Sequence, residues 1–233
     1  MLAAQVAVTT SLEHPERGDP SRRVEAHRAP GQVDRLDGGG LYRRRAIEEA
    51  GYFSDRNLHS YEEFDLASRL RGLGWKLWRL PVDATTHYGH EAPPYRLLMR
   101  RWRSRYACAP GELLRAALGQ PRLKLVLRNV RELRLYFAVL AWWLVLLTVP
   151  AWPLPLATRL GAFAGIAVAP WLAMLWRKRS LGRANYSIAS WCVNSAAMVR
   201  GLLARRVPPI QPIPSRVLKE PTATTRTGQK ACS

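Results

Sequence analysis

Two long apolar runs in the second half of the chain constrain its fold more than any other feature. The first run covers residues 135–156 and has no charged residue in 22 positions. As an α-helix it would be about 33 Å long, which matches the ~30 Å hydrocarbon core of a bilayer. The second run covers residues 160–176, and the prolines between the two runs favour a turn. The sequence therefore predicts two transmembrane helices over residues 135–176, joined as a hairpin.

Positive charge is concentrated at the outer ends of this hairpin. The chain has 36 Lys and Arg against 17 Asp and Glu, which gives a formal net charge of +19. Basic residues beside a span favour the cytoplasmic side and attract anionic membrane lipid. We therefore expect a multi-pass protein of the cell membrane with a cytoplasmic soluble part. Because the charge crowds the hairpin ends and not one face of a folded domain, it does not indicate a nucleic-acid partner.

The other segments differ in composition and periodicity. Residues 1–32 lack apolar periodicity and are expected to be disordered, and the Pro-rich residues 205–233 are expected to form a disordered tail. A compact domain is expected over residues 33–108, followed by basic juxtamembrane helices over residues 109–134. Residues 177–204 are basic and partly apolar, so they are interpreted as an interfacial helix or a weak third span.

One helix start in the compact domain is well marked. Ser60-Tyr61-Glu62-Glu63 fits a capping box, in which the serine and the second glutamate satisfy the free backbone N–H groups at the helix start. Leucines at positions 66, 70 and 73 form an apolar stripe, and Gly74 is a typical helix stop. A strand-like stretch over residues 75–80 follows.

Several short segments in this domain stand in a recognisable order. They are DGGGLYRR at residues 37–44, AGYF at 50–53, EEFDL at 62–66 with Arg69 and Leu70, Gly74-Trp75, and His87. In order and spacing they resemble the C-terminal half of a family 2 glycosyltransferase with a GT-A fold. The combination is fairly specific, although each segment alone is a weak signal.

The resemblance implies an α/β fold, in which a partial GT-A-like, Rossmann-like domain precedes the transmembrane α-helical hairpin. It implies an inverting enzyme that transfers a sugar from a nucleotide-sugar donor to a polysaccharide or lipid-linked acceptor. It also implies that the glycine-rich loop lies against the sugars, with the substrate-binding residues Asp37, Gly38, Gly39 and Gly40.

The acidic segment at the helix start carries the catalytic role that the resemblance implies. Glu63 stands where the family usually has the Asp that acts as base, and a base is needed because an acceptor hydroxyl is a poor nucleophile until its proton is removed. Glu62 and Asp65 match the flanking acids, which orient the acceptor or support the helix. Structurally, the same acids also suit a capped helix N-terminus.

The resemblance also implies a divalent metal, Mn or Mg, with His87 and His90 as ligands. Arg101-Trp102 resembles the Arg-Trp pair of processive family members, which lines the acceptor and diphosphate region. The glutamine that precedes this pair in the family is absent here, which argues against a long-chain polymer synthase. Alternatively, Trp102 is an interfacial anchor and the arginines contact lipid.

The nucleotide-binding half of the family is not found. Residues 1–36 contain no Asp-x-Asp motif and no Rossmann-like pattern. Another chain that supplies this half is therefore an expected partner. The alternative function is a non-catalytic, truncated or partner-completed membrane module.

Overall fold

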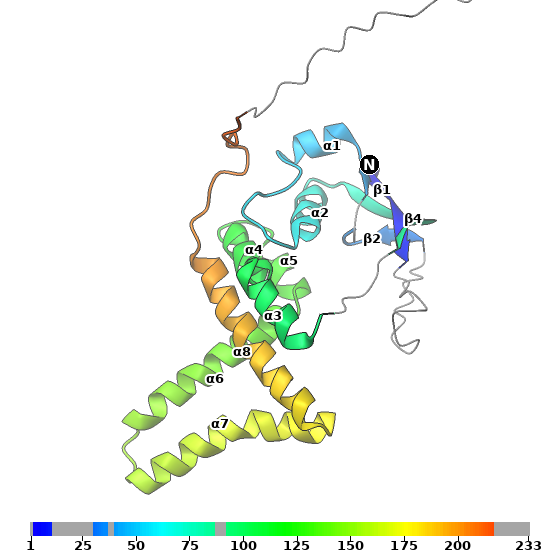
Figure 1. The fold of residues 1–233 in the computed structure, drawn as a ribbon. Helices are drawn as coiled ribbons and strands as arrows, with labels where there is room; N and C mark the ends of the chain where they lie inside the picture. Colours follow the sequence, from blue (N-terminus) through cyan, green and yellow to red (C-terminus); the bar gives the residue numbers. More distant parts are fainter. Residues whose placement is uncertain (1, 11–29, 37–39, 87–91, 217–233) are drawn as a thin grey trace, which may run out of the picture.

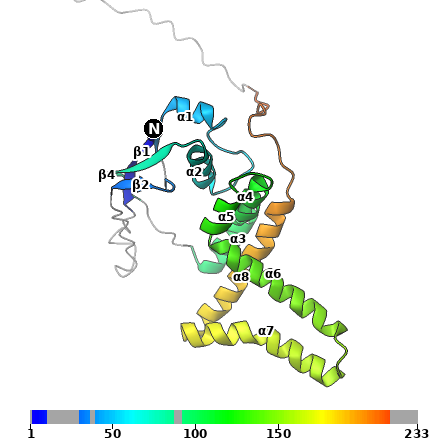
Figure 2. The ribbon, with the colours of Figure 1, turned by 180° about the vertical axis from the view of Figure 1, so that it is seen from behind.

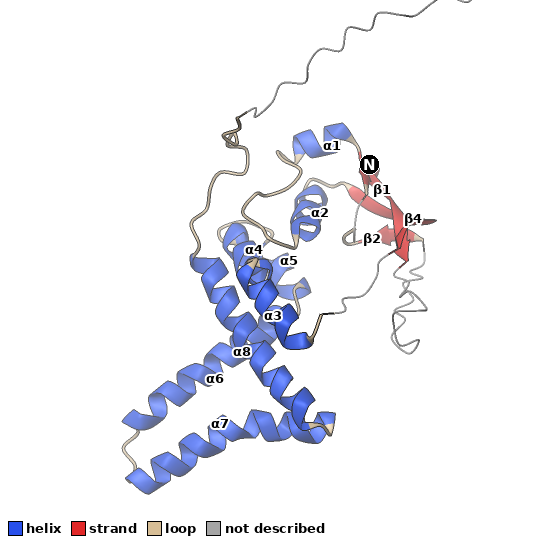
Figure 3. Cartoon of the chain, viewed as in Figure 1, coloured by secondary structure: helices blue, strands red, loops and turns tan. Residues whose placement is uncertain are grey.

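The structure is a computed structural model, which describes residues 2–10, 30–36, 40–86 and 92–216 (Figure 1). A small sheet with two helices lies at one end, and a group of longer helices forms the remainder. Figure 3 shows how unequal the two parts are, because helices make up most of the described chain.

The sheet has two long central strands and two very short outer ones, in the order β2-β4-β1-β3. The central strands β1 and β4 are parallel, with Ala4 opposite Leu77. The outer strands are antiparallel to their neighbours. The strands are β1 (Leu2–Thr10), β2 (Gly31–Val33), β3 (Leu41–Tyr42) and β4 (Lys76–Thr86).

Two helices, α1 (Arg44–Glu49) and α2 (Glu62–Gly72), precede β4. Leu66 and Leu70 lie one turn apart on α2 and are buried against Trp75 and Leu77 of the strand region. Gly74 connects α2 to β4 with φ +82°, a left-handed conformation that glycine adopts without steric cost. Two residues of the predicted apolar stripe, Leu66 and Leu70, therefore form the core under the sheet, whereas the third, Leu73, is 52% exposed.

The remaining helices run from residue 94 to residue 203. Phe64 of α2 enters their core beside Leu113, Leu133 and Met198, so α2 packs on both the sheet and the helices. The helices are α3 (Pro94–Arg103), the short 3-10 helix η2 (Tyr106–Cys108), α4 (Ala109–Ala117), α5 (Leu123–Asn129), α6 (Glu132–Thr148), the 3-10 helix η3 (Val149–Ala151), α7 (Leu156–Lys178) and α8 (Leu181–Leu203).

Helix α8 crosses the other helices at very short range. A Cβ atom added at Gly201 would lie 2.1 Å from the backbone oxygen of Cys108, and one added at Gly111 would lie 1.8 Å from that of Met198. Real Cβ atoms do not approach so closely, so the contact between α4 and α8 depends on glycine at both positions. Helix α8 is thus packed tightly against η2 and α4.

Two helices are long and apolar enough to cross a membrane, spanning Glu132–Ala151 and Leu156–Lys178. The ring nitrogen of Trp142 donates to the backbone oxygen of Ile166 over 2.9 Å and joins them. They extend away from the sheet part, and both contact α8, as Figure 2 shows from behind. The positions of both helices agree with the two apolar runs of the sequence. Helix α8 is not among the candidate spans of the described residues.

The expected fold class, an α/β Rossmann-like domain, is wrong. The protein is mostly helical with a small sheet. A Rossmann-like domain repeats parallel β-α-β units, whereas the described strands contain one parallel pair, β1 with β4. Residues 33–86 supply only one strand of that pair, β4, and the larger part of the chain has helical periodicity.

Both ends of the chain also differ from the expected disorder where the structure describes them. Residues 2–10 form β1, because β4 supplies a partner for a stretch that has no periodicity of its own. After α8, Asn57 and Val207 exchange two hydrogen bonds of 2.7 and 2.8 Å, and Arg56 donates to the backbone oxygen of Gln211 over 3.0 Å. Residues 11–29 and 217–233 lie outside the described residues.

Candidate functional site

A pocket of ≈ 250 Å³ lies where the sheet part meets α6, the first candidate membrane span. It is formed by the segment after β2, the start of α2, the residue that opens η2 and the first residue of α6. Its lining is mostly polar, with two carboxylates, one guanidinium, two phenols and one hydroxyl beside two apolar side chains. The lining residues are Arg35, Leu36, Ser60, Tyr61, Glu63, Phe64, Tyr106 and Glu132.

Two loops that frame this pocket adopt unusual backbone conformations. Tyr61 has φ +66° and Arg105 has φ +62°, the left-handed region that non-glycine residues rarely adopt. The hydroxyl of Ser60 donates to the backbone oxygen of Tyr106 over 3.3 Å and joins the two loops. Strained residues of this kind persist only where the surrounding contacts hold them, and they concentrate at functional sites.

The predicted capping box does not form. Tyr61, not Ser60, is the residue before α2, and no side chain caps the helix. The Ser60 hydroxyl donates to the backbone oxygen of Tyr106. The interpretation of the acidic segment as part of a capping box therefore lacks the serine hydrogen bond on which it depends. Glu63 instead lines the pocket, half-buried.

The negative charge of Glu63 affects the pKa of Tyr42. Burial raises the pKa of Tyr42 to about 12, and the negative charge of Glu63 adds to the effect. On the other wall, burial raises the pKa of Tyr61, with a further contribution from the carboxylate of Glu132, while Arg35 opposes it. Both phenols are therefore neutral hydrogen-bond donors near neutral pH.

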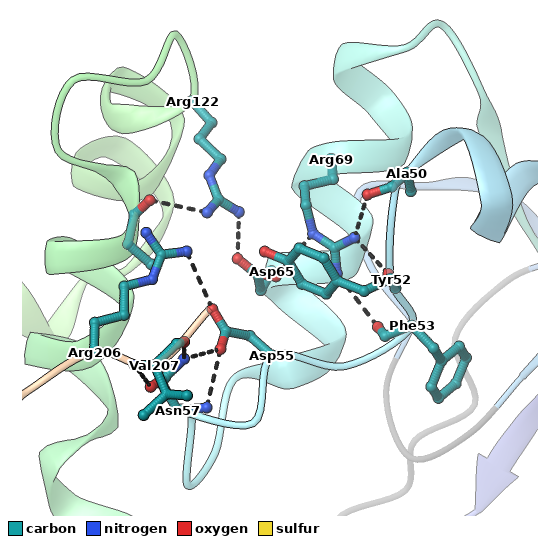
Figure 4. Close-up of polar contacts among 11 residues, drawn as sticks. Ala50, Tyr52, Phe53, Asp55, Asn57, Asp65, Arg69, Arg122, Arg206 and Val207 are labelled. Atoms are coloured by element: carbon teal, nitrogen blue, oxygen red, sulfur yellow. Dashed lines mark hydrogen bonds and ion pairs between the residues drawn. The ribbon is translucent and has the colours of Figure 1, made fainter. Parts of the chain in front are cut away.

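The two other acids of the segment have different surroundings. Glu62 is exposed and does not line the pocket. Asp65 is fully buried and forms ion pairs with Arg122 and with Arg69, whose Nε lies 2.9 Å from Oδ2 (Figure 4). Asp65 therefore supports the helix, which is one of the two roles expected for it.

Arg101 and Trp102 point to different places. The guanidinium of Arg101 lies 5.4 Å from the centre of the Tyr106 ring, at the edge of the pocket. Trp102 packs against Ala107, Cys108 and Ala197, and Arg200 lies over its ring at 5.4 Å. Arg101 is thus near the candidate site, whereas Trp102 contacts α8.

The remaining sequence candidates contribute less. Asp37, Gly38, Gly39, His87 and His90 lie outside the described residues. Gly40 is described and is exposed before β3. Among the described residues, no group of three His, Cys, Asp or Glu side chains is arranged to hold a metal ion.

Sequence reasoning missed Arg35, Tyr106 and Glu132. A signal for Glu132 was present, because Glu112 and Glu132 are the two acids in the strongly basic stretch from residue 96 to residue 134. Glu112 is buried and lies 2.9 Å from Nδ1 of His59, and Glu132 lines the pocket. An acid among so many bases thus marks a specific contact. For Arg35 and Tyr106 no local pattern was available.

The chain was compared with protein-family models, curated proteins and solved structures, and none of the three comparisons found a match.

Proposed function

We propose that the protein is a membrane-anchored inverting glycosyltransferase, or the acceptor-side part of one, and that Glu63 is its catalytic base. The observation that carries the proposal is the position of Glu63 in a polar pocket of tyrosines, a second carboxylate and an arginine. The likeness of the EEFDL segment to family 2 glycosyltransferases supports the same role. The mostly helical fold gives no independent support.

The pocket residues suit an acceptor hydroxyl. In the proposed reaction Glu63 accepts the hydroxyl proton while the oxygen forms a bond to the anomeric carbon and the bond from that carbon to the leaving diphosphate breaks. Tyr61 and Tyr106 offer ring faces and hydroxyls for a sugar, and Glu132 accepts hydrogen bonds from further hydroxyls. Arg35 and Arg101 carry the positive charge that phosphate groups require.

A divalent ion, Mn or Mg, belongs to the proposal through the family resemblance. When bound, such an ion would stabilise the charge of the leaving diphosphate. Among the described residues, no group of three or more His, Cys, Asp or Glu side chains would hold it.

The position of the pocket beside α6 is consistent with an acceptor held near a membrane. Glu132 both lines the pocket and begins the first candidate span. We propose that the soluble part is cytoplasmic, because Arg177, Lys178 and Arg179 follow the second span. Nucleotide sugars would then reach the pocket from the cytoplasm, and the basic helices would contact anionic lipid.

The role of Glu63 is tested by comparing Glu63→Gln with Glu62→Gln, an adjacent and isosteric change outside the pocket. The full chain in detergent is supplied with a panel of nucleotide sugars, Mn or Mg, and a membrane lipid extract or oligosaccharides as acceptors. We expect sugar transfer to fall at least a hundredfold in Glu63→Gln, as for loss of a general base, and to change little in Glu62→Gln. Equal transfer by the wild type and Glu63→Gln would disprove the assignment.

One observation favours the alternative of a partner-completed module. The outer strands β2 and β3 have 3 and 2 residues beside central strands of 11 and 9, so much of the sheet edge has no pairing within the described chain. Exposed edges of this kind pair readily with another chain. This alternative predicts no transfer by the protein alone and recovery of transfer when a chain with the nucleotide-binding half is co-expressed.

A further inference from the structure

A second and larger cavity lies on the other side of α2, between that helix and the turn that connects α4 to α5. Its volume is ≈ 510 Å³, within the range of about 300–1,000 Å³ that is typical of small-molecule sites. The sheet part contributes Tyr52, Arg69 and Leu73 to its lining. The helical part contributes Arg122 and Arg206, so the cavity spans the seam between the two parts.

Three arginines face this cavity, and two buried aspartates lie behind them (Figure 4). Asp65 pairs with Arg69 and Arg122, and Asp55 lies 3.5 Å from Arg206. Both aspartates are fully buried, so they neutralise two of the three guanidinium groups and leave one positive charge. The other charged lining residue, Glu49, is itself paired with Arg45.

The three guanidinium groups differ in how many of their five N–H donors are used. Arg69 donates to Asp65 and to the backbone oxygens of Ala50, Tyr52 and Phe53, so it is held in place and nearly satisfied. Arg122 makes two contacts, to Asp65 and to the backbone oxygen of Ala116.

Arg206 makes one contact within the described chain, the long one to Asp55. Its side chain is 40% exposed, against 13% for Arg122. Arg122 and Arg206 therefore both have N–H donors that contacts within the described chain do not use. Guanidinium groups bind phosphate oxygens by paired hydrogen bonds.

The rest of the wall can accommodate an organic group. The Arg69 guanidinium stacks on the Tyr52 ring at 3.7 Å, which fixes the ring at the edge of the cavity. Leu73 and Pro121 add apolar surface, and Gln120 adds an amide. This combination suits a sugar or a base attached to a phosphate.

The cavity lies away from the membrane-crossing hairpin. Arg206 follows the end of α8, and a helix of 23 residues is about 34 Å long, so α8 separates it widely from the end of α7. Figures 1 and 2 both show α4 and the end of α8 on the side opposite the hairpin. A ligand here would come from solution and not from the bilayer.

We propose that this cavity binds the phosphate group of a small soluble ligand of sugar-phosphate or nucleoside-monophosphate size, through Arg122 and Arg206. Binding would join the sheet part to the helical part and hold them together. The site is separate from the Glu63 pocket, so the inference stands whether or not the protein transfers a sugar.

The test uses the full chain in a neutral, phosphate-free detergent. Inorganic phosphate, glucose 1-phosphate and uridine monophosphate are titrated against it at constant ionic strength, with sodium chloride as reference. Binding is followed by calorimetry and by the thermal unfolding midpoint. The variant is Arg206→Gln, which disturbs one long contact, and the control is Arg205→Gln, which removes the same charge from an exposed neighbour outside the cavity.

We expect phosphate compounds to raise the unfolding midpoint and chloride not to. Arg206→Gln should weaken binding at least tenfold, because a hydrogen bond from a charged donor contributes more than one from a neutral donor. Arg205→Gln should leave binding within twofold, since Arg205 lies outside the cavity. Equal shifts with chloride, or equal loss in both variants, would show general screening of charge and overturn the proposal.

A second arm of the experiment distinguishes a lipid headgroup phosphate from the phosphate of a soluble ligand. The protein is placed in vesicles of phosphatidylcholine with and without phosphatidylglycerol. A soluble ligand predicts the same phosphate affinity in both vesicles. Competition by phosphatidylglycerol that is lost in Arg206→Gln would assign the site to lipid and refute a soluble occupant.

Discussion

At the scale of single residues, the described part of the protein buries three carboxylates. Asp55, Asp65 and Glu112 are each at most 1% exposed, and each has a cationic or histidine partner on another element. Buried carboxylates are costly unless they are paired. These three residues therefore specify how the sheet part and the helices fit together.

Asp65→Asn should be strongly destabilising, since it leaves the guanidinium groups of Arg69 and Arg122 buried without their carboxylate. We expect a loss of about 3–5 kcal/mol in the free energy of unfolding, measured by denaturant titration in detergent. The matched change Asp34→Asn removes an exposed pair with Arg71 and should cost about 0–1 kcal/mol. Similar losses in both variants would contradict the role of burial.

The phenol of Tyr42 should limit stability in alkali. Its pKa in the folded protein, about 12, exceeds the usual tyrosine pKa of 10.0, so the neutral phenol stabilises the fold fully below pH 10. This contribution is lost as pH rises from 10 through 12. Tyr42→Phe should flatten the decline of the unfolding free energy over that interval, as monitored by circular dichroism, and an unchanged slope would contradict the shift.

At the scale of elements, the crossing of α4 and α8 is the contact most sensitive to added volume. Gly201→Ala places a methyl group against the backbone of α4, so we expect it to cost at least about 1–3 kcal/mol, the usual range for overpacking. Gly182→Ala lies on the same helix, where a Cβ meets nothing within 4 Å, and should be neutral or stabilising by up to about 1 kcal/mol. Thermal unfolding of the two variants checks this difference.

The sequence predicts some elements well and others poorly, for physical reasons. The helices α6 and α7 are evident because spanning depends on local length and composition. The start of α2 lies one residue later than the capping box predicts, because Tyr61 precedes the helix and Ser60 has a tertiary partner in Tyr106. Strand β1 was missed because it depends on pairing with β4, which follows it by more than sixty residues.

The candidate site was only partly predictable. Glu63 was identified from a segment pattern, whereas Arg35, Tyr106 and Glu132 come together through the packing of α2, η2 and α6. A sequence shows which residues are acidic or aromatic, but it does not show which distant loops a side chain such as Ser60 will join.

At the scale of the whole molecule, the outer turn of the α6–α7 hairpin and the soluble part should lie on opposite sides of a membrane. In a cysteine-free background, Ala151→Cys should react with an impermeant thiol reagent only from outside the cell, and the exposed position Ile213→Cys only after the membrane is opened. Labelling of both residues from the same side would rule out the hairpin.

The paired hydrogen bonds between Asn57 and Val207 join positions that are 150 residues apart. A ribosome that adds about 5–20 residues per second makes the second position roughly 8–30 s after the first. Both candidate spans lie between these two positions, so they are synthesised during that time. The contact between Asn57 and Val207 therefore forms only after both candidate spans have been made.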